Sequence, residues 1–297
     1  MLSKASENVD PALRTGRRTL ISIDLHVYSA PAMAKATPIH GLSAGARLSE
    51  LGPRILTARL RDLERHEPLL PQEEPVHDMR VAARRLRAAL RLLRLRELDP
   101  PVKQLQDALG GVRDLQLQVA WLRGRDDSLA QERAARLGQA ERDLSGALEQ
   151  WHDSSLPRIL EAVARRKFRG KLGGAEVRKL LRKRLERFEE RLDAALARTT
   201  PPSMHRVRIS VKQLRYLFEL SPGAASRLLL PELTPLQEAL GELHDVDVRI
   251  RLLQSRRRPA LLREQKEDRD RLSSMVAAEL SRWKKRRIAQ RARRKLL

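Results

Sequence analysis

The stretch VHDMRVAARRLRAALRLLR, residues 76–94, decides how the rest of the sequence is interpreted. At about 100° per residue, a helix over this stretch gathers apolar residues such as Met79, Leu86 and Leu90 in one sector. The opposite sector, about 100° wide, holds a histidine and a row of arginines. We call this row the first basic stripe: His77, Arg80, Arg84, Arg87, Arg91 and Arg94.

Two interpretations of this row are open, because aligned cations repel each other by about 0.2–0.5 kcal/mol per i,i+4 pair. The arginines either solvate a helix surface or hold an extended polyanion. Residues 204–218, MHRVRISVKQLRYLF, repeat the pattern, whereas Arg85, expected on the exposed surface, becomes Gln213. Recurrence at the same helical angles favours a binding site. The second basic stripe is His205, Arg208, Lys212 and Arg215.

A second motif is also duplicated. Residues 105–115 read LQDALGGVRDL and residues 236–246 read LQEALGELHDV, so that Arg113-Asp114 corresponds to His244-Asp245. The two copies lie 131 residues apart and the stripes 128 apart. We therefore divide the chain into an N-terminal extension at 1–43, expected to be poorly ordered, and two homologous halves at 44–170 and 171–297. Two repeats of this length predict two packed four-helix-type bundles related by a pseudo-two-fold axis, not a solenoid.

Composition indicates an all-α protein, since Leu, Ala, Arg and Glu dominate and β-branched runs are almost absent. The net charge of +23 points to a polyanionic partner: nucleic acid, an acidic membrane surface or polyphosphate. The absence of cysteine excludes disulfides and thiolate metal sites. No apolar run reaches the roughly 18 residues that a membrane span needs.

A histidine-centred basic helix followed by an LG-x-x-(R)-D segment, present twice, resembles the CHAD family, the conserved histidine α-helical domain. The resemblance rests on VHDMRVAARRLRAALRLL with LQDALGGVRDL, and on MHRVRISVKQLRYLFEL with LQEALGELHDVDV. It covers the chain from about residue 44 to the end. It implies two helical bundles with a basic central channel that binds inorganic polyphosphate, and in bacteria an association with polyphosphate granules.

The resemblance also implies a set of phosphate ligands, to which the stripe adds Arg91. The sequence departs from the family pattern at two positions: Gln116 stands where an acid is expected, and His244 stands where an arginine is expected. Because of the second departure, the purely structural role of an arginine cannot be assigned to position 244. The implied ligands are His77, Arg80, Arg84, Arg87, His205, Arg208, Lys212 and Arg215.

Several of these residues have a second interpretation. His77 and His205 either cap and pack a helix start or bind phosphate, and a binding role predicts tighter binding as the pH falls through about 6.5. Asp114 and Asp245 are catalytic carboxylates or, as we favour, partners that orient an arginine. Residues 281–297 contain no acid and form either a solvated tail or an auxiliary contact. The auxiliary basic candidates are Arg113, His244, Lys284 and Lys285.

Three functions are compared. The favoured one is non-enzymatic polyphosphate binding in the cytoplasm, at polyphosphate granules. The second is non-specific RNA or DNA binding, for which the stripes lack aromatic stacking residues. The third is a phosphotransferase that uses a phosphohistidine. No catalytic residue, cofactor or metal is expected, since the sequence has no HExxH or GxxxxGK motif and no His/Cys cluster. The sequence does not define the oligomeric state.

Overall fold

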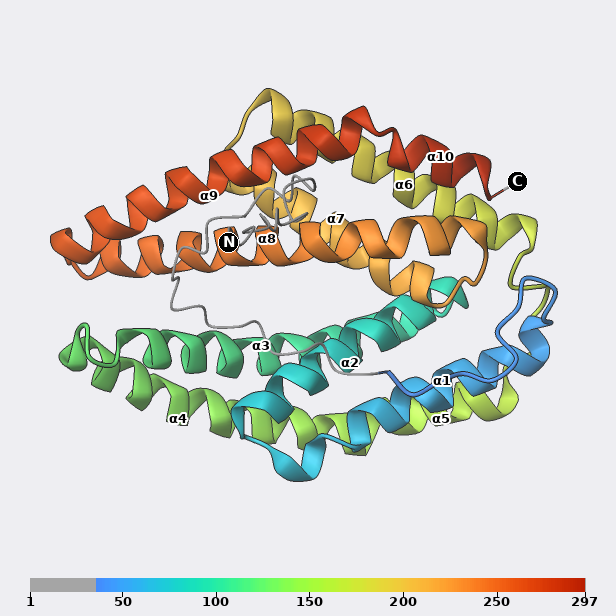
Figure 1. The fold of residues 1–297 in the computed structure, drawn as a ribbon. Coiled ribbons are helices and arrows are strands. Elements are labelled where there is room, and N and C mark those ends of the chain that lie inside the picture. Colours follow the sequence, from blue (N-terminus) through green and yellow to red (C-terminus); the bar gives the residue numbers. More distant parts are fainter. Residues whose placement is uncertain (1–35, 297) are drawn as a thin grey trace, which may run out of the picture. The chain divides into compact units, whose positions relative to one another are not determined.

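The computed structural model describes residues 36–296, and within them the chain is all-helical, as the composition predicted (Figure 1). The first half forms α1 (Leu48–Glu64), α2 (Glu73–Leu92), α3 (Asp99–Leu122), α4 (Asp127–Gln150) and α5 (Leu156–Arg165). The second half forms α6 (Ala175–Ala197), α7 (Pro201–Glu219), α8 (Ala224–Ser255), α9 (Pro259–Lys285) and α10 (Ile288–Arg294). In this part of the chain, no helix has the length and hydropathy of a transmembrane span.

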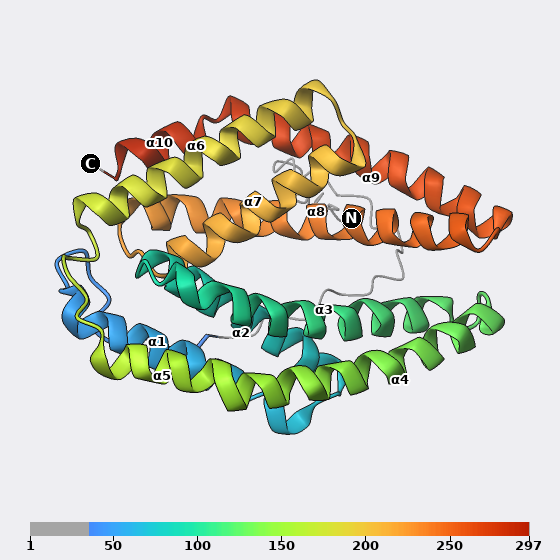
Figure 2. The same ribbon diagram turned by 180° about the vertical axis from the view of Figure 1, so that it is seen from behind.

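The same succession of helix contacts occurs in both halves. In the first, α1 packs on α2, α2 on α3 and α3 on α4; in the second, α6 packs on α7, α7 on α8 and α8 on α9. Figures 1 and 2 show α1–α5 gathered on one side and α6–α10 on the other. The two groups share one apolar core and meet where α2 contacts α7, so the two striped helices lie at the centre of the fold.

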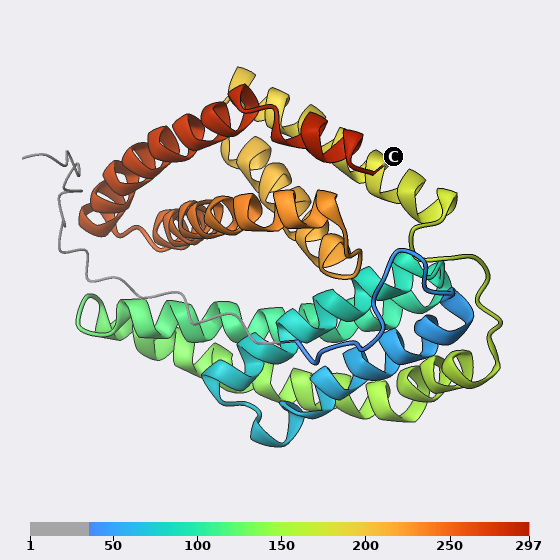
Figure 3. The same cartoon turned by 45° about the vertical axis from the view of Figure 1, so that its right-hand side comes forward.

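The halves also meet at the tips of two long helical hairpins, α3–α4 and α8–α9, which lie at the same end of the molecule (Figure 3). Trp121 of α3 packs in a small separate cluster with Leu252 and Leu253 of α8. Arg249 of α8 lies over the Trp121 ring, 5.1 Å from its centroid, and Arg258 pairs with Asp126. The halves are therefore in contact at an apolar, central place and at a mixed, peripheral one, in addition to the backbone hydrogen bonds from Leu172 and Gly173 to Ala46 and Ala44.

Two proline pairs begin helices. Pro100-Pro101 and Pro201-Pro202 lie in the first turns of α3 and α7, where the missing N–H would have no helical partner. The first striped helix ends at Leu92, several residues before the end near residues 99–101 that the sequence predicts, because Arg94 adopts a left-handed backbone conformation with φ of 62°. Arg94 therefore lies outside the helix that carries the rest of its stripe.

The expected N-terminal extension falls outside the described residues for positions 1–35, but residues 36–43 are held against α1. The Thr37 amide donates to Asp62 Oδ1 at 2.8 Å, and Arg59 Nη2 donates to the Thr37 carbonyl at 3.0 Å. Ile39 and Leu42 pack against the core. The expectation of a poorly ordered segment therefore does not apply to these eight positions, since polar and apolar contacts both fix them.

Candidate anion-binding site

The contact between α2 and α7 brings the two basic stripes within electrostatic reach of each other. Lys212 of α7 has Arg84 and Arg80 of α2 among its strongest charged neighbours, and it also acts on His77. Arg208 of α7 is affected by Arg84 in the same way. The cations of the two halves therefore face a common region. We call this group the crossing site: His77, Arg80, Arg84, Arg113, His205, Arg208, Lys212 and His244.

The guanidinium group of Arg80 lies against α3 at Gly110. A Cβ added to Gly110 would come within 3.3 Å of Arg80 Nη2 and 3.4 Å of its Nε, so the absence of a side chain leaves room for the guanidinium. Arg80 Nη1 donates to Asp114 Oδ1 at 3.3 Å. The Nε is buried and makes no hydrogen bond within residues 36–296. Burial, followed by Arg84, lowers the pKa of Arg80 to about 10.

Arg208 occupies the corresponding position in the second half, close to Asp245. Asp245 is the strongest charged neighbour of Arg208 and holds its pKa up against the lowering effect of burial. Burial raises the pKa of the Asp245 carboxyl, and Arg208 opposes that rise. The Nε of Arg208 is buried and makes no hydrogen bond in the described part of the chain. Both stripes thus contain buried guanidinium nitrogens without a hydrogen-bond partner in residues 36–296: Arg80 Nε in the first, and Arg208 Nε and Arg215 Nη1 in the second.

Lys212 lies in an unfavourable electrostatic environment. Desolvation is the main cause of a pKa well below the usual value for a lysine, and Arg84, Arg208 and Arg80 lower it further. Asp245 is the carboxylate that opposes these effects. A partly buried ammonium group among three guanidinium groups is stabilised by an anion that enters the site. The arrangement is therefore suited to anion binding.

Three histidines lie in the same region and are neutral near pH 7. Burial, followed by Arg113, Arg84, Arg80 and Lys212, lowers the pKa of His77 to about 4. Burial and Arg208 lower the pKa of His244 to about 3, and the pKa of His205 is lowered for the same reasons. The His205 and His244 ring centroids are 5.1 Å apart. Neighbouring cations therefore disfavour imidazolium in the empty site, and the expected tightening of binding with falling pH depends on the pKa that His77 has when an anion is bound.

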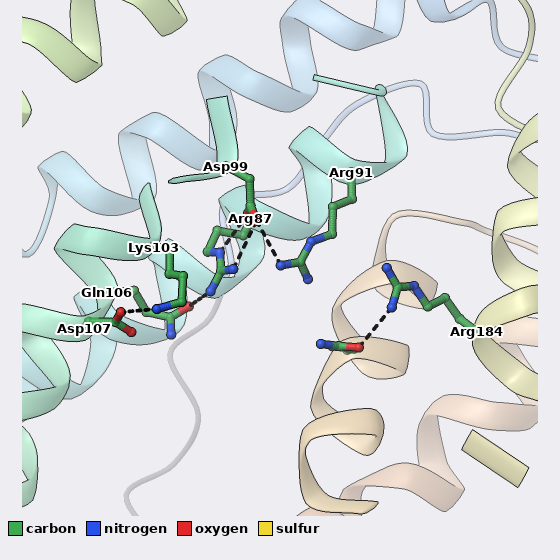
Figure 4. Close-up of polar contacts among 8 residues, drawn as sticks. Arg87, Arg91, Asp99, Lys103, Gln106, Asp107 and Arg184 are labelled. Atoms are coloured by element: carbon green, nitrogen blue, oxygen red, sulfur yellow. Dashed lines mark hydrogen bonds and ion pairs between the residues drawn. The ribbon is translucent and has the colours of Figure 1, made fainter. Parts of the chain in front are cut away.

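The C-terminal part of the first stripe has a carboxylate of its own (Figure 4). Arg87 donates through Nε and Nη2 to Asp99 Oδ1 and Oδ2 at 2.8 and 3.1 Å, and Arg91 Nη2 donates to Asp99 Oδ2 at 3.1 Å. In the second stripe, Arg215 Nε lies 3.3 Å from Glu219 Oε1. These three predicted ligands are partly neutralised, as Arg80 is by Asp114. Arg80, Arg84, Arg208 and Lys212 form the cationic centre, where cations from both halves are close together.

Arg85 is not on the exposed surface where the helical pattern placed it. Its side chain is buried, with 7% of the residue exposed, and its Nε lies 3.0 Å from Glu219 Oε2 of α7. Its guanidinium also lies over the Tyr216 ring, 6.0 Å from the centroid. This face of α2 is covered by α7 from the other half of the chain, a contact that the pattern of a single helix does not contain.

The auxiliary basic residues fall into two groups. Arg113 is buried, donates through Nη1 to Glu73 Oε1 at 2.6 Å and is the main charged neighbour of His77, so it belongs to the crossing site. Lys284 pairs with Asp193 at 2.7 Å, and Lys285 is exposed at the end of α9. The basic tail is folded as the end of α9 and as α10, with its apolar residues in the core. These core residues are Trp283, Ile288, Ala289, Ala292 and Leu296.

Residues 36–296 lack an exposed aromatic ring and a cluster of metal ligands, which are features of nucleic-acid and metal sites. Every Phe, Trp and Tyr there is buried, so none presents a ring for stacking on a base. No group of three or more His, Asp or Glu residues in the same range is arranged to hold a metal ion. The chemistry that the crossing site offers is that of charged nitrogen donors.

Comparison with known proteins identifies relatives of this fold. A family profile described as "CHAD domain" matches residues 54–254. The crystal structure of the CHAD domain from the plant Ricinus communis is similar, with a TM-score of 0.59 and 26% identity over 85% of this chain and 97% of that chain. PptA from Streptomyces chartreusis aligns with a TM-score of 0.51 and 17% identity over 85% of this chain and 100% of that one, which shows a shared fold alone. No curated protein matches the chain.

Proposed function

Because the chain belongs to the CHAD domain family, we propose that it binds inorganic polyphosphate without catalysis, at the crossing site. The observation that carries the proposal is the environment of Lys212. Its side chain is partly buried where α2 contacts α7, with Arg84, Arg208 and Arg80 as strong charged neighbours and Asp245 as the opposing carboxylate. A polyanion supplies the negative charge that this arrangement lacks.

The chemistry of the residues suits a chain of phosphates. Each guanidinium group can donate two hydrogen bonds to one phosphate, and such charge-assisted bonds are about twice as strong as neutral ones. A polymer that contacts one stripe is held at high effective concentration near the other. Since Arg84 belongs to the first half and Arg208 and Lys212 to the second, one chain of phosphates binds donors from both. Two halves of the fold thus contribute to one site.

The predicted ligands do not contribute equally. We assign direct phosphate contacts to Arg80, Arg84, Arg208 and Lys212, because they face each other across the two halves. Arg87, Arg91 and Arg215 hold carboxylates, so phosphate has to compete with Asp99 or Glu219 for them. His77, His205 and His244 add hydrogen bonds and, once protonated, charge.

The test is a calorimetric titration with long-chain inorganic polyphosphate at fixed salt. The Arg84→Gln/Lys212→Gln variant removes two charge-assisted contacts and is expected to bind at least about tenfold more weakly. The matched control, Arg165→Gln/Arg271→Gln, removes the same charge from exposed positions on α5 and α9 and is expected to bind almost as the wild type does. Equal losses in the two variants mean that only net charge matters, which contradicts the proposal.

Nucleic acid is the competing ligand, since phosphate contacts supply most non-specific affinity. The buried aromatic residues offer no stacking surface, so polyphosphate should displace single-stranded RNA or DNA at a much lower phosphate concentration than the reverse. Equal competition per phosphate would favour the nucleic-acid alternative. Release of orthophosphate from polyphosphate above the level of a His77→Ala variant would favour an enzyme. A fluorescent fusion that co-localises with polyphosphate granules would support the proposed location.

A further inference from the structure

A second group of arginines lies apart from the crossing site, between α6 and the C-terminal end of α2. Figure 4 shows the side chains of Arg91 and Arg184 extending towards each other from these two helices. Arg184, Arg187 and Arg191 follow each other at helical spacing along α6, and Arg96 lies in the short 3₁₀ segment Arg96–Leu98. We call this group the α6 arginine cluster: Arg91, Arg96, Arg184, Arg187 and Arg191.

The α6 members are held by neutral acceptors. Arg184 is half-buried and donates through Nη1 to Gln213 Oε1 at 3.2 Å. Arg191 Nη1 donates to Ser210 Oγ at 2.6 Å and to the Arg206 carbonyl at 3.4 Å. An amide, a hydroxyl or a carbonyl fixes a guanidinium without removing its charge. These contacts therefore position cations and leave them available to an anion.

Carboxylates near the cluster offset only part of its charge. Asp99 pairs with Arg91 and also with Arg87, and Glu190 acts weakly on Arg191. For Arg184, the four strongest charged neighbours are all arginines: Arg91, Arg187, Arg191 and Arg96. Burial and these neighbours lower the pKa of Arg184. Repulsion within the cluster is thus substantial when no anion is bound.

The α2–α7 contact that corresponds to the α6 arginine cluster by the internal repeat contains carboxylates. The 128-residue offset of the stripes relates Arg85 to Gln213 and Glu219 to Arg91. Where Arg85 meets Glu219, each arginine has a carboxylate partner: Glu219 pairs with Arg85 and Arg215, and Asp62 pairs with Arg59 at 2.6 Å. On the other side, Gln213 accepts a hydrogen bond from Arg184, and Arg91 stands at the position that corresponds to Glu219. Since a carboxylate fits one contact between α2 and α7, packing alone does not require an arginine in its place at the other.

We propose that the α6 arginine cluster is a second anion site, which binds a small, multiply charged phosphate such as inorganic tripolyphosphate. Guanidinium groups from α2 and α6 lie close together there, a geometry suited to bidentate contacts with a compact anion. Asp99 lies between this cluster and the crossing site along the first stripe, so the two sites are separated by a carboxylate. Binding here does not depend on the proposed function of the crossing site.

The experiment is a tripolyphosphate titration in the Arg84→Gln/Lys212→Gln background, where the crossing site is weakened. This protein is expected to retain one class of tripolyphosphate site. Adding Arg184→Gln and Arg191→Gln should weaken that site at least about tenfold. Adding Lys179→Gln and Lys183→Gln, which removes two exposed charges from the same helix, should leave the affinity within about twofold of the background.

Equal tripolyphosphate affinity in these two quadruple variants would overturn the inference. Arg187→Gln, at an exposed position of α6, provides the test if the half-buried Arg184 substitution unfolds the protein. It should weaken tripolyphosphate binding several-fold, and an unchanged affinity would contradict the inference. Long-chain polyphosphate binding to Arg184→Gln/Arg191→Gln in an otherwise wild-type protein reports on the crossing site separately. Failure of one site is therefore distinguishable from failure of the other.

Discussion

Arg80 of α2 lies directly over Gly110 of α3, so close that a Cβ at position 110 would come within 3.3 Å of Arg80 Nη2. The two residues are 30 positions apart in the sequence, and each belongs to one of the duplicated motifs. The contact explains why a glycine is placed inside α3, where it costs about 0.5–1 kcal/mol of helix stability relative to alanine. The glycine lets Arg80 reach Asp114.

The substitution Gly110→Ala tests this contact. The added methyl group should displace the guanidinium of Arg80 by a few tenths of an ångström or more and weaken polyphosphate binding several-fold. Gly241→Ala is the matched control, because no heavy atom lies within 4 Å of a Cβ added at the equivalent glycine. The control should raise the free energy of unfolding by up to about 1 kcal/mol without changing affinity. Equal affinities in the two variants would show that Gly110 has no role in placing Arg80.

Binding should be coupled to proton uptake. In the empty protein the pKa of His77 is about 4, because burial and Arg113, Arg84, Arg80 and Lys212 disfavour imidazolium. A bound polyanion favours imidazolium and raises this pKa, so affinity should increase as the pH falls through the bound-state pKa and level off below about 4. Calorimetry in buffers of different ionisation enthalpy measures the protons taken up. If the wild type and His77→Gln take up the same number of protons when they bind polyphosphate, His77 is not the group that is protonated.

The same histidine should affect stability in the opposite direction. Its pKa is near 6.5 in the unfolded chain and about 4 in the folded, empty protein, so the unfolded state binds the proton more readily. The contribution to stability is complete above pH 6.5 and decreases as the pH falls towards 4, by about 1–3 kcal/mol in total. Urea unfolding of wild type and His77→Gln at several pH values measures it. A difference between the two proteins that is constant from pH 7 to about 4 would contradict the assignment.

The buried ion pair between Arg85 and Glu219 should serve stability and not binding. Glu219→Gln weakens the charge compensation of a buried guanidinium and is expected to reduce the free energy of unfolding by about 1–3 kcal/mol. Arg165→Gln breaks an exposed i,i+4 pair on α5 and should cost less than about 0.5 kcal/mol. Polyphosphate affinity per folded molecule should be unchanged in Arg165→Gln and should not decrease in Glu219→Gln, because that substitution also releases Arg215 from its carboxylate. A large loss of affinity in Glu219→Gln would place this pair in the binding site instead.

Much of the fold was predictable from the sequence, because the relevant signals are local. Helical periodicity placed His77, Arg80 and Arg84 on one face, and the repeat placed Arg208 and Lys212 at the same angles. The all-helical class and the CHAD family followed from the same residues and are confirmed. The poorly ordered N-terminal extension is outside the described residues, apart from positions 36–43.

What the sequence did not indicate depends on contacts between distant segments. Arg85 has the pattern of an exposed residue, and its burial follows from the packing of α7 on α2. Arg87 lies in α2 and Asp99 begins α3, so their bidentate contact does not follow from a residue spacing within one helix. The sequence also did not indicate where α2 and α9 end. Arg94 and Arg287, which follow these helices, adopt positive φ without being glycine, the residue that normally marks such a position.

The central claim is that one polyphosphate chain is held by both halves of the protein where α2 contacts α7. The most direct measurement is a crystal structure of the protein with long-chain inorganic polyphosphate. The account predicts phosphate groups between the two helices, within hydrogen-bonding distance of both Arg84 and Lys212. Phosphates bound on the outer surfaces of α9 and α10, with the region between Arg84 and Lys212 empty, would contradict it.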